Sequence, residues 1–220
     1  MKKILIFLLC FVLVGCADNK DYQKALDEVF AGSEKAMVIR ANNYSKYFDY
    51  YIPSDTREFN SGPLYSLLEY DNSRFLMDVN IAGIVSQRYY PENTLIEEGF
   101  FDDEKLVYEK HGVYVTSDDD TLDYIYKLYQ YEDRYLASFR SRDLIFYAYI
   151  NEEDIVPSAS RMLLMAKGVH VKEEEVIADY SLKDVIDYEK KQVNLFETIM
   201  PVNGNINDFL VDKNDGQSDE

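Results

Sequence analysis

Length, composition and charge limit the classes of function open to this chain. It has 220 residues, with 41 acidic and 23 basic side chains and a formal net charge of −18 at pH 7. Proteins bind nucleic-acid phosphates through clustered lysine and arginine. Because the sequence has no basic run or stripe, this balance argues against nucleic acid as a partner. It also argues against electrostatic adhesion to an anionic lipid surface, whereas a cationic partner is open.

The first residues have the pattern of an export signal. Lys2 and Lys3 precede an unbroken apolar run over residues 4–14, and a positive start before a short apolar core is typical of a signal peptide. The run is much shorter than the roughly 20 residues that a helix needs to cross a bilayer. Polar residues follow at once. The segment therefore predicts a cleaved signal rather than a permanent membrane span.

A lipid-attachment pattern closes this run. Its four residues are Leu13, Val14, Gly15 and Cys16. They closely resemble the lipobox of bacterial lipoprotein precursors, which implies cleavage before Cys16, a diacylglyceryl group on its sulfur and often an acylated amine. Two acyl chains hold a protein stably at a membrane, so the expected location is the extracytoplasmic side of the cell membrane. The alternative is an ordinary secretory signal whose cysteine is incidental.

The rest of the chain predicts one α+β domain. Residues 1–15 are the expected signal peptide, and residues 16–20 are the lipidated cysteine with a short tether. Residues 21–211 contain no internal repeat and no Gly/Ser-rich linker, and residues 212–220 have the composition of a disordered acidic tail. The expected architecture is an N-terminal amphipathic helix packed on an antiparallel β-meander, followed by C-terminal helices.

The first predicted element is the amphipathic helix. Apolar residues recur at helical spacing through most of residues 21–51. Pro53 ends the pattern, because a proline disfavours helix in the residue before it. The side chains expected to face the sheet are Tyr22, Leu26, Val29, Phe30, Met37 and Phe48.

From about residue 64 the apolar period changes to two, which predicts β-strands. The predicted strands cover residues 64–70, 75–81, 84–90, 105–109, 112–116, 123–131, 134–140 and 144–150. Short polar turns separate several of them, including one at Lys110 and His111. Such connections leave no room for crossover helices, so the strands should pair as an antiparallel meander.

The helical period returns after residue 151. It predicts helices over residues 157–167 and 172–179. A third helix should begin after Ser181, which resembles a capping box with Asp184 three residues later, and end at Pro201. Its apolar residues are Val185, Ile186, Val193, Phe196 and Ile199.

The sequence offers no catalytic residue and no cofactor site. The two histidines, His111 and His170, lack the i, i+4 partner or HExxH setting of a helical metal site. His111 is expected in a hairpin turn, and His170 is expected half-buried in a connector. With Cys16 lipidated, no thiol nucleophile is left. No nucleophile-elbow, phosphate-loop or CxxC motif is present.

One acidic cluster is consistent with calcium binding, because hard cations bind several oxygens on one loop. It consists of Asp118 to Asp120 and of Asp123, three residues further along the chain. The cluster lacks the glycine and the distal glutamate of an EF-hand loop. A solvated turn between two strands is the favoured alternative.

Tyrosine is unusually frequent, with 20 tyrosines, 12 phenylalanines and no tryptophan. Several alternate along the predicted strands, as at Tyr124, Tyr126, Tyr147 and Tyr149, and alternation places residues of one parity on one face. Such a face suits a sugar or a protein partner, but it also suits a sheet surface covered by a helix. The covered sheet is favoured, with one parity inaccessible and the other partly exposed.

Two further segments resemble small uncharacterised lipoproteins of low-GC Gram-positive bacteria. They are residues 43–55, beginning Asn43-Tyr44, and residues 78–81. The resemblance implies a tethered accessory or binding protein of the cell envelope, with a protein or extracellular ligand as partner. The alternative is a cell-wall or glycan-processing enzyme that uses paired carboxylates, which would require a deep cleft and a strongly shifted pKa.

Overall fold

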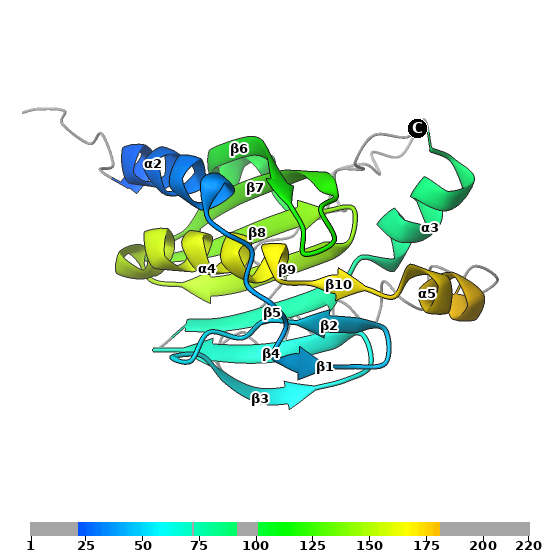
Figure 1. The fold of residues 1–220 in the computed structure, drawn as a ribbon. Coiled ribbons are helices and arrows are strands. Elements are labelled where there is room, and N and C mark those ends of the chain that lie inside the picture. The colour runs from blue at the N-terminus through cyan, green and yellow to red at the C-terminus, as the bar shows by residue number, and fades with distance from the viewer. Residues whose placement is uncertain (1–21, 72, 92–100, 181–220) are drawn as a thin grey trace, which may run out of the picture.

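A seven-stranded antiparallel sheet forms the centre of the molecule (Figure 1). The computed structural model describes residues 22–71, 73–91 and 101–180. The strand order is β3-β4-β5-β9-β8-β7-β6. The strands are β3 (Arg57–Ser61), β4 (Tyr65–Tyr70), β5 (Ser73–Val79), β6 (Leu106–Val115), β7 (Thr121–Tyr131), β8 (Arg134–Ser141) and β9 (Leu144–Ile150). Two meanders, β3 to β5 and β6 to β9, are therefore joined where β5 pairs with β9.

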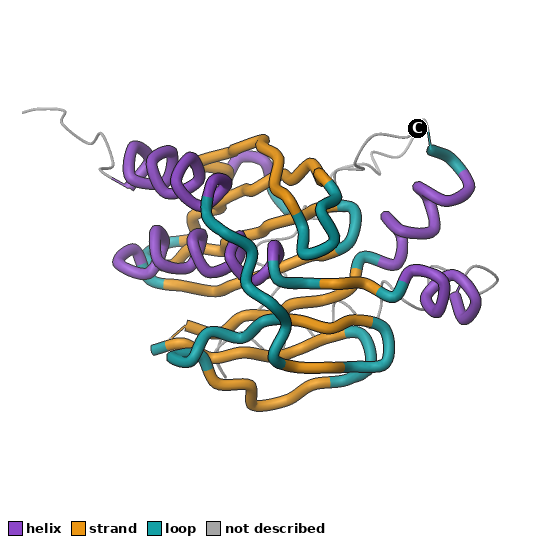
Figure 2. Tube along the Cα trace, viewed as in Figure 1, coloured by secondary structure: helices purple, strands orange, loops and turns teal. Residues whose placement is uncertain are grey.

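A second, smaller sheet and two helices cover one face of the large sheet. The small sheet has the order β1-β2-β10. Its strands are β1 (Asn43–Tyr44), β2 (Phe48–Tyr50) and β10 (His170–Val171). The helices are α2 (Tyr22–Lys35), α3 (Ile81–Tyr89), α4 (Ile155–Lys167) and α5 (Glu173–Tyr180), with short 3-10 turns at Asp103–Lys105 and Glu152–Asp154. Figure 2 shows α2 and α4 beside β6 to β9, and the small sheet beside β3 to β5. The predicted α+β class is confirmed.

Helix α2 packs on the meander through one stripe of aromatic and aliphatic residues. Tyr22, Leu26 and Phe30 recur every four residues and are buried. The Phe30 ring lies 5.7 Å from that of Tyr124 and 4.9 Å from that of Tyr126. The predicted packing of the N-terminal helix on the sheet is therefore confirmed, and we call the covered side of the sheet the helix face.

The predicted length of the first helix is wrong, because α2 ends at Lys35. Residues 43–50 instead form the hairpin of β1 and β2, in which Asn43 pairs with Tyr50. Phe48 is buried from a strand and not from the helix, and Met37 is 86% exposed. Aromatic residues in this stretch matched both a helical and a strand period, and the packing of the small sheet decided between them.

Residues predicted as a strand over 84–90 form helix α3. Asn80 caps this helix, since its side chain accepts a hydrogen bond from the backbone N–H of Gly83. The same side chain donates to the carbonyl of Ser141, 2.8 Å away. A Cβ on Gly83 would lie 2.4 Å from the carbonyl oxygen of Arg142, so the cap and the close approach together place the helix start against β8.

The two short strands predicted over residues 105–109 and 112–116 are one strand, β6. His111 pairs with Ile125 within the ladder, so its predicted place in a hairpin turn is wrong. Gly112 lies opposite Tyr124, and a Cβ there would meet the Tyr124 ring at 2.5 Å. The glycine is thus needed for close packing inside a strand and does not mark a turn.

The remaining strand and helix predictions agree with the structure in type and approximate position. Strands β4, β5, β7, β8 and β9 and helices α4 and α5 lie where the periods predicted them. Strand β3 was missed, since its residues are mostly exposed and have no apolar alternation. The predicted helix after Ser181 and the tail over residues 212–220 lie outside the described residues, as does Cys16.

Replacing Phe30 with alanine should lower the free energy of unfolding by about 3 to 5 kcal/mol, because it removes an aromatic side chain from a closed core. Urea unfolding of Phe30→Ala gives this value. The matched control is Met37→Ala just beyond the same helix, where the side chain is 86% exposed and the expected loss is below about 0.5 kcal/mol. Equal midpoints for the two variants would contradict the packing described for α2.

Candidate functional site

The tyrosines on the helix face belong to the core. Tyr114, Tyr124, Tyr126 and Tyr135 are each at most 1% exposed. Tyr124 donates its hydroxyl to Glu34 of α2 at 2.8 Å, and Tyr114 donates to Ser141 at 3.0 Å. Burial raises the pKa of the Tyr124 hydroxyl, and the hydrogen bond to Glu34 adds to the shift. These rings and hydroxyls are used inside the protein and cannot form a ligand-binding surface.

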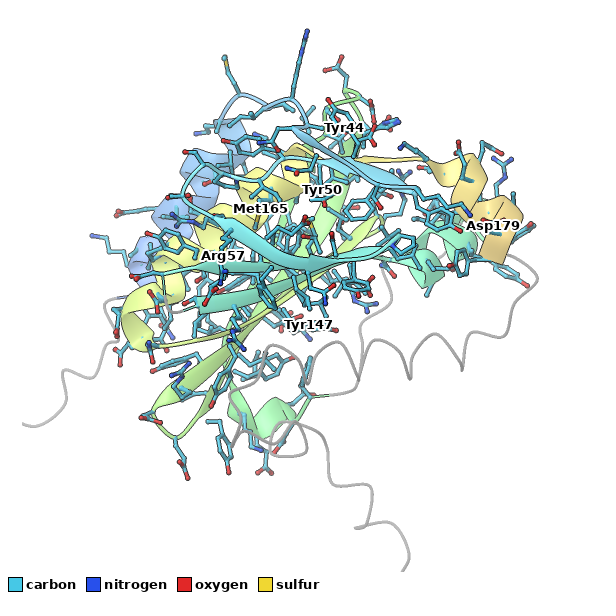
Figure 3. All side chains as sticks on the ribbon, turned by 90° about the horizontal axis from the view of Figure 1, so that it is seen from below. Tyr44, Tyr50, Arg57, Tyr147, Met165 and Asp179 are labelled. Atoms are coloured by element: carbon cyan, nitrogen blue, oxygen red, sulfur yellow. The ribbon has the colours of Figure 1, made fainter. Side chains whose placement is uncertain are left out.

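The opposite side of the sheet, which we call the far face, carries Tyr147 and Tyr149 of β9. Figure 3 places the labels of Tyr147 and the α4 residue Met165 on opposite sides of the strands. The expectation that this parity would be partly exposed holds in β7, where Asp123 is exposed. It is wrong for β9, because Tyr147 is 5% and Tyr149 is 9% exposed. The central strand is buried on both faces.

The far face also brings together charged residues that are widely separated in the sequence, Asp78 and Arg140. Arg140 of β8 is across from Ile145 of β9, which is in turn across from Asp78 of β5. Arg140 is 9% exposed and Asp78 is 1% exposed. Burial raises the pKa of Tyr147, and Arg140 opposes this shift. The Arg134 guanidinium lies 4.6 Å from the centre of the Tyr149 ring. Sequence inspection missed this group, because only the strand register aligns its members.

The acidic turn is organised around a hydroxyl group. The backbone N–H groups of Asp118 and Asp120 donate to Oγ1 of Thr116 at 3.3 and 3.2 Å. Asp119 has a positive φ of 65°, as aspartate in a tight turn can adopt. The turn joins β6 to β7, as the favoured interpretation predicted. Among the described residues, no group of three or more possible ligands could hold a metal ion.

The two histidines lie apart and each binds a neighbouring carboxylate. Nδ1 of His170 is 2.6 Å from Asp118, and this contact links β10 to the acidic turn. The predicted half-buried connector is wrong in both respects, since His170 lies in a strand and is exposed. Nε2 of His111 is 2.5 Å from Glu109 on the same strand.

An arginine with two carboxylates fastens α5 to the sheet. Nε of Arg142 donates to Asp143 at 2.5 Å, and a terminal nitrogen donates to Glu173 at 2.6 Å. Burial raises the pKa of Glu173, whereas Arg142 opposes the shift. Both carboxylates therefore bind one cation, and the pair has the geometry of a structural ion pair and not of two carboxylates facing across a substrate.

Lys167 at the end of α4 is 1% exposed. Its Nζ donates to the carbonyl oxygens of Ser33 at 3.0 Å and Glu34 at 3.1 Å, and also to that of Ala36. These carbonyls lie at the end of α2, where helical carbonyls lack partners within the helix. Burial lowers the pKa of the Lys167 ammonium group, and Glu34 opposes this shift. The lysine thus caps α2 from the neighbouring helix.

No protein-family model matches the chain, and comparison with curated proteins gives no match. Within residues 22–71, 73–91 and 101–180, no helix is both long and apolar enough to cross a membrane.

Replacing Lys167 with methionine should lower the free energy of unfolding by at least about 2 kcal/mol, because buried carbonyl groups then lose their donor. Chemical denaturation measures the loss. The control is Lys24→Met on α2, where the side chain is 84% exposed and its nearest carboxylate oxygen is 3.8 Å away. That variant should change stability by less than about 0.5 kcal/mol. A Lys167→Met protein as stable as the control would show that the cap is dispensable.

Proposed function

We propose that this protein is a membrane-anchored extracytoplasmic lipoprotein that acts as a non-enzymatic binding or accessory protein of the cell envelope. The anchor is a lipid on Cys16, and the lipobox at residues 13–16 supports it. The first residue that the structure describes, Tyr22, packs edge-on against Tyr135 with ring centres 5.9 Å apart. A lipid on Cys16 would therefore hold the domain close to the membrane surface.

The use of the titratable groups supports binding over catalysis. Asp118 and Glu109 contact histidines, Asp143 and Glu173 share Arg142, and Lys167 caps a helix. A general acid or base needs a proton-transfer atom within reach of a substrate. Each of these groups is instead bonded to another side chain or backbone group of the fold, and this single pattern carries the proposal.

The alternative is a glycan-processing enzyme with paired carboxylates. One observation favours it, namely the raised pKa of Glu173, which is a property of general acids. The neighbouring carboxylate of Asp143 binds the same Arg142 as Glu173 does. Because both carboxylates are bonded to this arginine and do not face a substrate, the enzyme is the second of the two proposals.

The lipid anchor predicts that Cys16→Ser abolishes incorporation of a fatty-acid probe and leaves the precursor uncleaved when the full chain is expressed in a bacterial host. The diacylglyceryl group would be attached to the sulfur atom of Cys16, and a serine at this position has no sulfur to carry it. Gel fluorescence and mass measurement report the two effects. The control is Cys10→Ser, within the apolar run that is removed, which should be labelled and cleaved normally. Normal labelling of Cys16→Ser would refute the anchor.

A further inference from the structure

Two arginines lie on either side of Tyr149 on the far face of the large sheet. Arg74 of β5 is directly across from Tyr149 of β9. On the other side of β9, Tyr149 is across from Leu136 of β8, and Arg134 is two residues before Leu136. Because side chains two residues apart on a strand share a face, both arginines lie on the far face. Strands β5 and β8 are two strand spacings apart, which is about 10 Å.

Each of these two guanidinium groups lies against an aromatic ring. The central carbon of the Arg74 guanidinium is 5.5 Å from the centre of the Phe59 ring, and that of Arg134 is 4.6 Å from the centre of the Tyr149 ring. Such a contact orients the long side chain, while the N–H groups at the edge of the planar guanidinium can still bind an acceptor. Arg74 is exposed and Arg134 is half-buried. The two cations are therefore oriented by the fold itself.

Neither arginine has a carboxylate within ion-pair distance among the described residues. Glu69 is across from Arg74, but it accepts a hydrogen bond from Arg57 instead. Nε of Arg134 is buried, and it has no hydrogen-bond partner in the described part of the chain. A guanidinium that is partly removed from water without an acceptor is unfavourable. An anionic group bound from outside would supply the acceptor.

The spacing of the two arginines favours a ligand that carries several carboxylates. A guanidinium binds one carboxylate through two parallel hydrogen bonds, and one carboxylate cannot reach both cations across about 10 Å. In an extended peptide, alternate side chains lie on one side and are about 7 Å apart, which the long arginine side chains can accommodate.

The remaining charges of the protein limit how acidic this ligand can be. The net charge of −18 repels a dense polyanion at long range. Glu132 and Asp133, in the turn that precedes Arg134, are both exposed. At moderate ionic strength, however, charges further than about 10 Å away are largely screened. A short segment with a few carboxylates can therefore bind the two arginines, although the whole protein is acidic.

The ring contacts argue against an acidic sugar as the ligand. A sugar ring stacks on an open aromatic face, whereas a guanidinium lies over the rings of Phe59 and Tyr149. Tyr149 is also only 9% exposed. Recognition of carboxylates on a polypeptide requires no open ring, because the arginines supply the contacts.

We propose that Arg74 and Arg134 form a binding site for a short acidic segment of a partner protein. This inference rests on the binding role proposed above and adds the chemistry of the partner, namely glutamates or aspartates on alternate positions of an extended chain. Each guanidinium binds one carboxylate. The Phe59 and Tyr149 rings hold the two guanidiniums in the orientation that this contact requires.

A peptide of alternating glutamate and serine, about ten residues long and labelled with fluorescein, tests the site by fluorescence anisotropy with the full chain in neutral detergent. It should bind saturably, whereas a matched peptide of alternating glutamine and serine should not. Arg74→Gln and Arg134→Gln should each weaken binding at least about fivefold, because each removes a charge-assisted contact. The control, Arg40→Gln, removes the same charge from an exposed position between α2 and β1. It should weaken binding less than about twofold.

The lysine variants separate the geometry of the site from its charge. Arg74→Lys and Arg134→Lys keep the charge and lose the planar fork, so the loss of affinity should be intermediate. Because Arg134 is half-buried, urea unfolding checks the fold of its variants. If Arg134→Gln does not fold, the exposed Arg74 decides the test.

The proposal is overturned if the parent does not bind the glutamate peptide, if the glutamine peptide binds equally well, or if Arg74→Gln binds as tightly as Arg40→Gln. Binding of polygalacturonate in place of the peptide would also overturn it, in favour of an acidic sugar. Fatty-acid labelling of Cys16 is measured separately. Failed labelling with normal peptide binding refutes only the anchor, whereas normal labelling without peptide binding refutes only the site described here.

Discussion

The pairing of β5 with β9 is the constraint on which the rest of the structure depends. It brings residues 73–79 beside residues 144–150 and joins two meanders, each of which could form from local contacts, into one sheet. All seven residues of β9 are buried. Such burial is typical of a strand in the middle of a sheet, whose sequence is a continuous apolar run. Helices α2 and α4 lie beside β6 to β9 and the small sheet lies beside β3 to β5, so this pairing also sets how the two covers lie relative to each other.

Polar groups at the joints between layers fix how these covers sit. Lys167 bonds the end of α2 from α4, and Glu58 of β3 accepts hydrogen bonds from Tyr50 and Ser66, which links the small sheet to the large one. Arg142 holds α5. Buried polar groups of this kind are costly unless they are paired, so they favour one arrangement of layers over others. Glu58, Asp143 and Glu173 are thus carboxylates that have a structural use within the described part of the chain.

The sequence-based predictions failed where two periods fitted the same residues. In residues 84–90, Ile84 and Val85 matched a strand, but the cap by Asn80 selects a helix. At Lys110 and His111, polar residues suggested a turn, although an edge strand tolerates them because one side of it faces solvent. The deciding partner of Asn80 is Ser141, 61 residues along the chain. That of His111 is Ile125 on the next strand, a pairing that the polar residues at positions 110 and 111 do not indicate.

The sequence by itself determined the α+β class, the positions of most strands along the chain and the amphipathic start of α2, because these follow from local apolar periods. It also predicted the acidic turn between β6 and β7. Tertiary structure alone decided which tyrosines are buried, since burial depends on what covers each face. It also assembled Asp78, Arg140 and Tyr147 on the far face, because a strand register aligns residues that linear spacing cannot relate.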